Sequence, residues 1–308
     1  MILGIDIGGK RIKTGLVNEA GTLVETASAP TPASLDGFVA AVHELIGRVC
    51  AKGQPDAAGI GCKGILHPTD TTVEVLPGTM HYLEGQKLSE LFASVFPARI
   101  PIHADNDARV ALAGEAAWGA ARGRTEVVML TLGTGVGGAI ISGGKLLRGA
   151  TGVAGHIGHL TIDPRGPMCI CGNRGCLETF FSATAIEQAA GDAVERGCDS
   201  MLPPAPTCAD VFRVAAEGDR VAALIVNEAT QTLAAAIAGL VHILDPEIVI
   251  LGGQISEAGE ALFSPLREEV HIRTRCLLRR KVPLIPPQIV DRSGVVGAAA
   301  IATERMRR

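Results

Sequence analysis

Hydrophobic and polar positions alternate along the first 30 residues and predict a three-stranded meander. Residues 2 to 29 give strand, glycine turn, strand, polar turn and strand, with the clearest alternation from Ile12 to Val17. Hydrophobic residues at helical spacing follow between Phe38 and Val49, and Ser34 or Asp36 is the expected N-cap. We expect this first unit to continue with short buried strands at 58–66 and 100–103 and a helix over about 107–119.

The opening pattern returns at Glu126, with predicted strands at 127–132 and 138–141 and a turn at 142–145. Two strand-loop-strand units, each followed by helices and further strands, predict a duplicated α/β domain with a cleft between the copies. The remaining expected elements are helices near 182–197, 208–217 and 219–242, a strand at 247–251 and a terminal helix at 295–306.

Composition favours a globular protein of two domains, because 308 residues with 47% hydrophobic content exceed one compact core. A net charge of −4 gives no electrostatic footprint for nucleic acid, and we expect the Arg279–Lys281 triplet to be a solvated turn. We expect no export signal at the start of the chain, and no membrane span, because no apolar stretch reaches about 18 residues without a glycine or a polar interruption. Five of the eight cysteines are scattered singly, which indicates a reducing, cytoplasmic location.

Four soft ligands in one short run predict a zinc site, because thiolates and an imidazole are the groups that zinc prefers. Four protein ligands close a tetrahedral site, so we expect the ion to organise structure beside the chemistry. Gly172 and Gly175 allow the tight turns that this requires. The alternative is three buried thiols and a surface histidine. The expected ligands are His159, Cys169, Cys171 and Cys176.

Three glycine-rich loops follow predicted strands, at 6–11, 132–138 and 251–254. Glycine lets successive backbone N–H groups approach a phosphate closely, although any one of these loops could be an ordinary tight turn. None has the P-loop spacing. The second loop resembles a dinucleotide fingerprint but precedes a strand where that fingerprint needs a helix. Together the three loops predict phosphate binding in a repeated unit.

Two acidic positions are candidates for the chemistry. Asp6 ends its strand at the first loop, where its carboxylate could hold the hydration shell of a phosphate-bound magnesium or simply cap a turn. Asp107 closes the run Asp105–Asn106–Asp107 and could accept a proton from a substrate hydroxyl, serve as an N-cap, or do both.

The combination resembles the ROK family of sugar kinases and sugar-responsive repressors, over nearly the whole chain. The resemblance implies an actin-like, hexokinase-like α/β fold of two duplicated domains, whose cleft binds ATP and a sugar. We expect a smaller domain at 1–108 with the terminal helix 295–308, and a larger domain at 109–294 that carries the zinc knuckle. The motifs that carry the resemblance are Asp6–Gly9, Leu132–Gly135, Asn106–Asp107 and Cys169–Glu178.

The resemblance also implies roles for individual residues. Asp107 is the catalytic base, Asn106 and Glu178 bind sugar hydroxyls, and His159 binds zinc with one nitrogen and the sugar with the other. Magnesium accompanies ATP. The residues expected to bind ATP and its phosphates are Asp6, Gly8, Gly9, Lys10, Arg11, Gly133, Thr134, Gly135, Gly252 and Gly253.

This chain departs from the family pattern at three places. Lys10–Arg11 stands where Thr-Lys is common, which adds a positive charge near the phosphates. Lys63 precedes Gly64 in the loop that faces the sugar, where small residues are usual. His156 replaces a glutamate, so that an imidazole takes the place of a carboxylate acceptor, and we expect Lys63, Gly64 and His156 to contribute to sugar choice.

These observations predict an ATP- and magnesium-dependent kinase that phosphorylates a primary hydroxyl of a hexose. Glucose is the leading substrate, while N-acetylmannosamine, amino sugars and C7 cyclitols stay open. The alternatives are a sugar-responsive repressor or a non-catalytic sugar sensor. The family's repressors carry a DNA-binding helix-turn-helix ahead of this core, whereas the sequence starts at the core's first strand. The expected partners are sugar and ATP, with no nucleic acid or membrane, in a homodimer.

Overall fold

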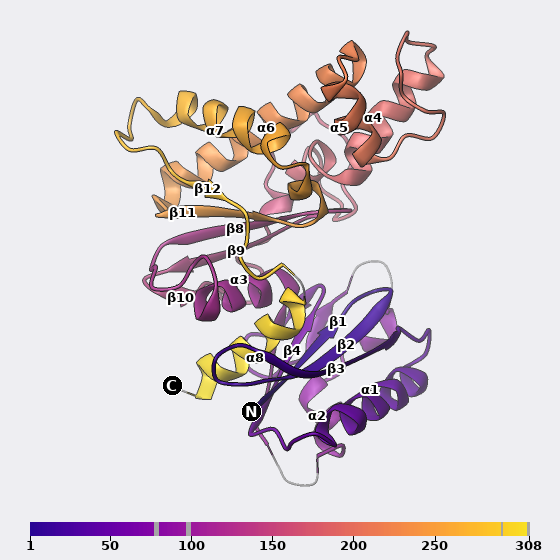
Figure 1. Cartoon of the computed structure of the whole chain (residues 1–308), viewed down its shortest axis with the longest axis vertical. Helices are drawn as coiled ribbons and strands as arrows, with labels where there is room; N and C mark the ends of the chain where they lie inside the picture. Colours follow the sequence, from indigo (N-terminus) through magenta and orange to yellow (C-terminus); the bar gives the residue numbers. More distant parts are fainter. Residues whose placement is uncertain (77–79, 97–99, 291, 307–308) are drawn as a thin grey trace. The chain divides into compact units, whose positions relative to one another are not determined.

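The computed structural model describes residues 1–76, 80–96, 100–290 and 292–306. This part of the chain forms two compact units, each with its own five-stranded sheet (Figure 1). The first domain was expected to end at residue 108, whereas the first unit continues through residue 124. It also includes the segment 146–154, in addition to the C-terminal helix. The first unit comprises Met1–Arg124, Leu146–Ala154 and Pro287–Arg308, and the second Thr125–Lys145 and Gly155–Pro286.

The first sheet contains the predicted meander. Its first three strands pair antiparallel, and β4 and β7 then continue the sheet parallel to β1. Because the carboxyl ends of parallel strands meet at one edge, Asp6, Cys62 and Asn106 come to the same edge of this sheet. The sheet order is β3-β2-β1-β4-β7, with β1 at Ile2–Ile7, β2 at Arg11–Val17, β3 at Leu23–Pro30, β4 at Ala57–Cys62 and β7 at Ile102–Asn106.

The region predicted as one strand at 58–66 is two strands. β4 ends at Cys62, and a turn at Lys63–Gly64 leads into β5 (Ile65–Leu66), which pairs with β6 (Val73–Val75). Gly64 has a φ of +92°, and a Cβ there would lie 2.2 Å from the carbonyl oxygen of Val75. The turn at 63–64 therefore requires glycine at its second position.

The described residues of the first unit form four α-helices. Ser34 caps α1 (Leu35–Cys50) by accepting a hydrogen bond from the Gly37 N–H, so Ser34 and not Asp36 is the N-cap. The short α2 (Leu88–Ala93) and the 3-10 turn His81–Leu83 were not predicted. The other two helices are α3 (Asp107–Trp118) and α8 (Ser293–Met306).

Helix α8 packs directly on the backbone of the first sheet. A Cβ on Gly4 would lie 2.0 Å from the Val295 carbonyl oxygen, and one on Gly59 would lie 1.7 Å from that of Ala298. The helix also packs against α3, and Figure 1 shows it beside β1 and β4. Glycine in the two central strands thus lets the C-terminal helix complete the core of the first unit.

The second sheet repeats the opening of the first. An antiparallel pair, β8 and β9, is joined by β11, which runs parallel to β8. β9 begins at Val136, two residues before the strand predicted at 138, so only Gly133, Thr134 and Gly135 separate β8 from β9. The sheet order is β10-β9-β8-β11-β12, with β8 at Val127–Leu132, β9 at Val136–Ser142, β10 at Lys145–Leu146, β11 at Ile248–Gly252 and β12 at Leu284–Ile285.

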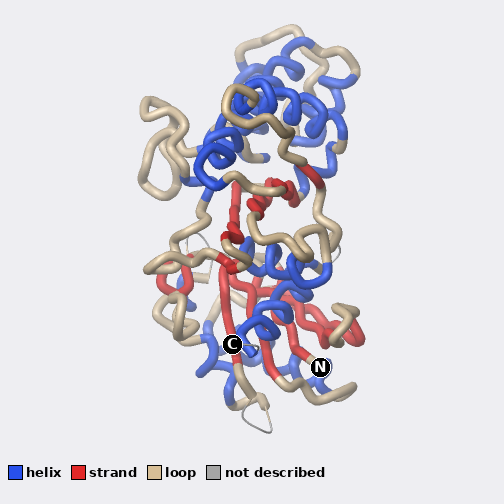
Figure 2. The backbone as a smooth tube through the Cα atoms, turned by 90° about the vertical axis from the view of Figure 1, so that its left-hand side faces the viewer, coloured by secondary structure: helices blue, strands red, loops and turns tan. Residues whose placement is uncertain are grey.

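Four helices form a layer over one face of the second sheet (Figures 1 and 2). The predicted helices near 182–197, 208–217 and 219–242 are present, with ends shifted by no more than two residues. The helix at 260–274 was not predicted, because its apolar stripe is weak and Pro265 lies within it. The four are α4 (Ala183–Glu195), α5 (Cys208–Ala216), α6 (Arg220–Leu244) and α7 (Glu260–Thr274).

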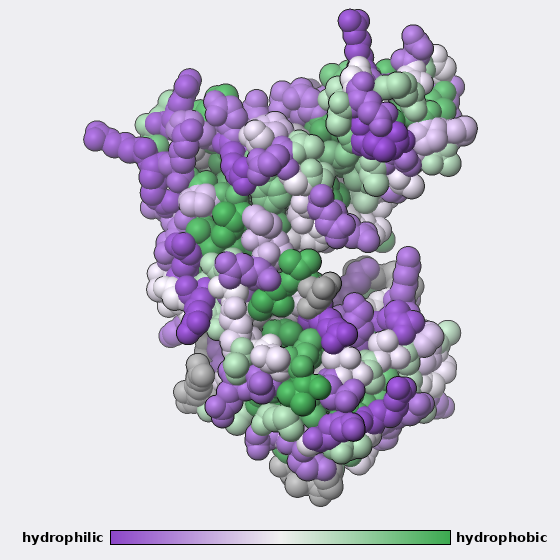
Figure 3. Space-filling model, viewed as in Figure 1, coloured by the Kyte–Doolittle hydropathy of each residue, from purple (hydrophilic) through white to green (hydrophobic). Residues whose placement is uncertain are grey.

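Helix α6 is long and apolar enough to cross a membrane, judged by length and composition alone. It instead packs against α4, α5 and α7, with residues such as Leu233, Ile237 and Val241 buried in the core of the second unit. Hydrophilic side chains are spread over the face of this unit seen in Figure 3. The position of α6 is therefore that of a core helix.

Candidate functional site

The four predicted soft ligands come together in the second unit. The Nδ1 atom of His159 lies 3.6 Å from the Sγ atom of Cys169, and the Sγ atoms of Cys171 and Cys176 lie 3.7 Å apart. All four ligand atoms lie within 4.8 Å of one another. Tetrahedral zinc implies S···S distances of about 3.8 Å and S···N distances of about 3.6 Å from its usual bond lengths. The donor set therefore has the number, chemistry and spacing of a tetrahedral zinc site.

Two glycines shape this knuckle. Gly172 and Gly175 have φ values of +85° and +66°, as the sequence analysis requires of them. A Cβ on Gly175 would lie 1.5 Å from the carbonyl oxygen of Asp163, so any other residue would push the chain apart. Asn173 Nδ2 donates to the hydroxyl of Thr161 at 2.8 Å and lies 3.6 Å from the Sγ atom of Cys176. The knuckle is thus held by its own backbone and side chains as well as by the four ligands.

Glu178, expected to bind a sugar hydroxyl, lies against the second glycine loop. Its Oε2 atom accepts a hydrogen bond from the Val136 N–H at 2.8 Å. A Cβ on Gly135 would lie only 2.2 Å from the same oxygen. Gly135 therefore makes room for the Glu178 carboxylate, a role that the phosphate-loop interpretation of this glycine did not include.

His156 and His159 lie at a 3-10 turn, Ile157–His159, that packs on β9, and His156 is the residue that precedes the turn. Their rings are nearly parallel, with centroids 6.4 Å apart and an angle of 14° between the ring planes. Since Nδ1 of His159 faces Cys169, its Nε2 is the nitrogen left for another ligand. The turn fits because Gly158 has no side chain, as a Cβ there would lie 2.0 Å from the Val136 carbonyl oxygen.

The third glycine pair closes on the end of β8. Gly252 is the last residue of β11 and is buried, so only Gly253 lies outside the strand. Gly253 has a φ of +88°, and a Cβ there would lie 2.4 Å from the carbonyl oxygen of Leu132. The second and third loops are therefore neighbours within the second unit. Their adjacency comes from the parallel pairing of β11 with β8.

In the first unit, the loop after β1 is a tight turn. The Gly8 N–H donates to the Arg11 carbonyl at 3.1 Å, and the Thr31 hydroxyl donates to the Gly8 carbonyl at 2.6 Å. Gly9, Lys10 and Arg11 are exposed. The loop thus presents two cationic side chains to solvent at the carboxyl edge of the sheet.

The two candidate carboxylates act on each other electrostatically. Asp6 is half-buried, and its removal from water raises the pKa of its carboxyl above the ordinary aspartate value. Lys13 lowers that pKa and the charge of Asp107 raises it. Asp107 is exposed, and its Oδ1 accepts the Ala108 N–H at 2.9 Å. An exposed carboxylate at the start of α3 thus lies near a half-buried one close to the end of β1.

Asn106 is the N-cap of α3. Its Oδ1 accepts the Ala108 N–H at 3.0 Å, while its Nδ2 donates to the Gly64 carbonyl at 2.9 Å. The N-cap interpretation considered for Asp107 was therefore wrong by one residue, and Asp107 is the first residue of the helix. Asn106 also fixes the 63–64 turn, on which Lys63 is exposed. The structure thus brings Asn106, Gly64 and Asp107 together at one edge of the first sheet.

The sequence analysis missed a buried ionic cluster next to this edge. Arg109 is 1% exposed and Asp105 is 3% exposed, and both are charged residues in the core. Arg109 lies two residues after Asp107 on α3, and a buried arginine there has no hydrophobic pattern to reveal it. The only signal was an arginine on the face of α3 that a core helix normally fills with apolar side chains.

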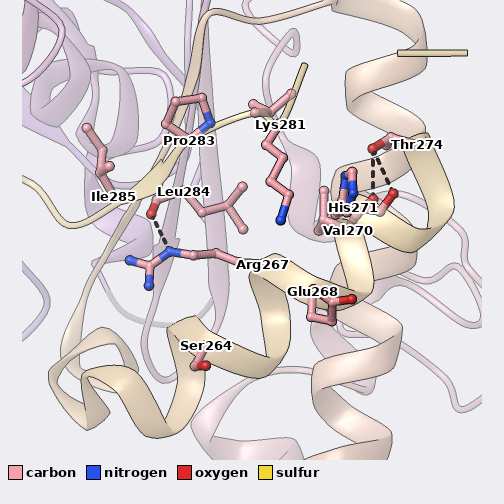
Figure 4. A pocket seen from close by; sticks show the side chains of 11 residues that line it. Ser264, Arg267, Glu268, Val270, His271, Thr274, Lys281, Pro283, Leu284 and Ile285 are labelled. Carbon is pink, nitrogen blue, oxygen red and sulfur yellow. Dashed lines mark hydrogen bonds between the residues drawn. The ribbon is translucent and has the colours of Figure 1, made fainter. Parts of the chain in front are cut away.

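A separate cavity of about 600 Å³ lies in the second unit, between α7 and the segment 281–285 (Figure 4). Arg267 Nε donates to the Leu284 carbonyl at 3.2 Å at its wall, and Lys281 points into it. Its lining contains none of the residues expected to bind sugar, phosphate or metal. The cavity is therefore not the site described above.

Comparisons with known proteins agree with this description. Residues 2–305 match the ROK family. The chain is 35% identical to a glucokinase from Thermotoga maritima, over 99% of this chain and 98% of the relative.

Two solved structures are similar over nearly their full length. A ROK hexokinase from Thermus thermophilus has a TM-score of 0.87 at 29% identity, with 99% of each chain covered. A ROK family glucokinase from Streptomyces griseus, in complex with glucose and AMPPNP, has a TM-score of 0.81 at 30% identity, with 98% of this chain and 99% of that one covered. These similarities confirm the expected actin-like α/β fold.

Proposed function

This chain belongs to the ROK family, and we propose that it is an ATP- and magnesium-dependent glucokinase that forms glucose 6-phosphate. The observation that carries the proposal is the full-length similarity to glucokinases, combined with an exposed carboxylate, Asp107, beside Asn106, the N-cap of α3. Fold alone would not indicate a substrate. The similarity in sequence supports the sugar, and the residues at the end of β7 support the chemistry.

Asp107 is the proposed general base. The oxygen of the sugar's primary hydroxyl attacks the γ-phosphorus, its proton passes to the Asp107 carboxylate, and the bond from phosphorus to the ADP oxygen breaks. Exposure of Asp107 leaves its carboxylate accessible to a substrate hydroxyl. Asp6, whose pKa is raised by burial, is the second carboxylate of this pair and has a different environment, which suits a different role.

We assign phosphate binding to the glycine loops and their cations. Lys10 and Arg11 contribute charge from the first unit, and the loops that follow β8 and β11 contribute N–H groups from the second. Magnesium bound with ATP supplies neutralisation of the phosphate oxygens. Asp6 is the proposed group for its hydration shell, because it lies one residue before the end of β1, next to the first loop.

Sugar recognition is assigned to Glu178, His159 and Asn106. Glu178 uses Oε2 for the Val136 N–H, so Oε1 is the oxygen that we assign to a sugar hydroxyl. His159 offers Nε2, since Nδ1 faces the cysteines. In the first unit, Asn106 keeps a second N–H on Nδ2 beyond the one donated to Gly64. Lys63, Gly64 and His156 are the proposed contributors to selectivity among sugars.

The knuckle is proposed to hold one structural zinc ion. Four protein ligands leave no open coordination position, so zinc would stabilise the fold and orient the His159 ring. The 3-10 turns that carry His159 and Glu178 pack against each other, which links metal binding to sugar recognition. The residues that would hold zinc are His159, Cys169, Cys171 and Cys176.

We further propose a cytoplasmic homodimer. The eight cysteines, all within the described residues, are free thiols, which is typical of a reducing compartment. A coupled assay of ADP release across hexoses, amino sugars, N-acetyl sugars and cyclitols tests the proposed substrate. We expect the highest kcat/KM with glucose, and a preference for another sugar would reassign the substrate within the same chemistry.

A further inference from the structure

A buried ion cluster, consisting of Asp105, Arg109 and Arg148, lies beside the proposed base. Arg109 is the largest fully buried side chain among the described residues, and only 10% of the Arg148 side chain is exposed. All three residues belong to the first unit, although Arg148 lies 39 positions further along the chain than Arg109. The cluster therefore joins the start of α3 to the segment 146–154, which belongs to the first unit although residues of the second unit precede and follow it in the sequence.

The Asp105 carboxylate is shared by three donors. Its Oδ1 accepts the Arg109 Nε at 2.5 Å and the Asn106 N–H at 2.8 Å, and its Oδ2 accepts the Arg148 Nε at 2.7 Å. Arg148 Nη2 also lies 3.4 Å from Oε2 of Glu304 on α8. The same oxygen that holds Arg109 thus holds the backbone of Asn106, at the corner that directs Asn106 and Asp107.

Arg109 reaches the returning segment with its other nitrogen. Its Nη1 donates to the carbonyl oxygens of Gly152 and Ala154, at 3.0 and 2.9 Å. Gly152 has a φ of +82°, and a Cβ there would lie 2.3 Å from the Leu66 carbonyl oxygen, so this segment packs on the first unit. Ala154 is two residues before His156 and five before His159. One guanidinium therefore fixes both the Asn106–Asp107 corner and the chain that leads to the two histidines.

Stability alone is a weak reason for such a cluster. Removing charges from water costs several kcal/mol per ion, and apolar residues of similar volume often serve a core as well or better. Well-satisfied charged hydrogen bonds instead fix direction, because a planar guanidinium binds its acceptors in one geometry. A protein can tolerate the free-energy cost of burying these charges when their hydrogen bonds hold neighbouring functional groups in a required orientation.

We propose that Asp105, Arg109 and Arg148 are positioning residues for phosphoryl transfer, which hold Asp107 in its working orientation and fix the segment that precedes His156. The inference rests on the proposed kinase function. Misplacing a reacting group by about 1 Å can cost about 10²-fold in rate. None of the three residues is among those assigned to sugar or phosphate binding, so we expect the loss of the cluster to act through Asp107.

Kinetics of Arg109→Lys and Arg148→Lys test the positioning role. Lysine keeps the positive charge but loses the planar fork, so we expect kcat to fall about 10- to 100-fold with the KM for ATP within about twofold. Arg213→Lys is the matched control, because Arg213 is exposed on α5 and pairs with Asp210 and Glu217. Unchanged kcat in folded Arg109→Lys and Arg148→Lys proteins would overturn the inference. If Arg109→Lys does not fold, the less buried Arg148→Lys decides.

Trypsin digestion tests the contacts independently of activity. Arg148 is protected in the wild type by its pairing with Asp105, so we expect little cleavage after it. In Arg109→Gln, the segment loses its bonds at Gly152 and Ala154, and mass spectrometry should show a new fragment beginning at Gly149. Equal cleavage after Arg148 in both proteins would overturn the proposal that Arg109 holds the segment 146–154 in place. A wild type that is inactive on every sugar would overturn the proposed function instead. The digestion would still show whether Arg109 holds the segment 146–154.

Discussion

A Cβ on Gly135 would lie 2.2 Å from the Oε2 atom of Glu178. The glycine that ends the second loop therefore leaves space for a carboxylate that arrives from 43 residues further along the chain. The Val136 N–H then fixes this carboxylate at 2.8 Å. Because Glu178 is the proposed sugar-binding group, we expect a change in this loop to alter sugar binding.

Gly135→Ala should raise the KM for glucose about 5- to 150-fold, because displacing Glu178 forfeits about 1–3 kcal/mol of charged hydrogen bonding. The φ of Gly135 is not in the left-handed region, so the backbone tolerates alanine and the effect is specific to the carboxylate. Gly133→Ala is the control, since its Cβ would meet nothing within 4 Å among the described residues. Equal glucose KM values in the two variants would contradict the relationship.

Elemental analysis should find about one zinc per chain, because the four ligand atoms lie at tetrahedral spacing. Cys171→Ser should lower both the zinc content and the thermal midpoint of unfolding. Cys198→Ser, at an exposed cysteine outside the knuckle, should change neither. Protein prepared without chelator that contains no zinc would refute the metal assignment.

Asp6→Asn should stabilise the protein at pH 7 while lowering its activity. Burial raises the pKa of Asp6, so the folded state binds the proton more tightly than the unfolded state does. The stability linked to this proton is present below the ordinary aspartate pKa and is lost as the pH rises through the folded pKa. Asparagine has no such proton, so the variant does not lose this stability as the pH rises. Its advantage over the wild type in free energy of unfolding should shrink as the pH falls toward 4. Denaturant midpoints of both proteins between pH 4.5 and 8 measure this, and a variant less stable at pH 7 would show that the sign is wrong.

His156→Glu should change the ranking of sugars. Glutamate only accepts hydrogen bonds, whereas neutral histidine also donates one, so the wild type tolerates an acceptor on the sugar at this place. One mismatched polar contact shifts relative kcat/KM by roughly 5- to 150-fold. We expect the variant to gain on glucose relative to sugars with an acceptor there, at unchanged KM for ATP. An unchanged ranking in a folded variant would mean that His156 only packs beside His159.

Local patterns allowed the sheets and most helices to be predicted. Alternation in Ile12–Val17 and the return of strand-loop-strand at Glu126 reflect a period that the backbone imposes directly. The metal site could also be predicted from a local pattern, because its three cysteines lie within eight residues of sequence. Helix α7 was missed because its apolar stripe is weak and Pro265 interrupts the sequence pattern.

Relationships between distant residues could not be predicted. Asp105 and Arg148 are 43 positions apart, and the pairing depends on where the segment 146–154 returns. The cap at Asn106 could not be told from one at Asp107, because both side chains can accept the Ala108 N–H. In each case the outcome is decided by the packing of elements, which a local pattern does not contain.

Asp107 is proposed to take the proton as glucose is phosphorylated. Identifying the reaction product, together with the rate of the Asp107→Asn variant, tests this role. We expect the wild type with ATP, magnesium and glucose to give glucose 6-phosphate and ADP in equal amounts, identified by ³¹P and ¹³C NMR. Asp107→Asn should keep the fold and glucose binding, with kcat at least about 10²-fold lower. A variant with kcat within a few-fold of the wild type, or a product phosphorylated at another hydroxyl, would contradict the account.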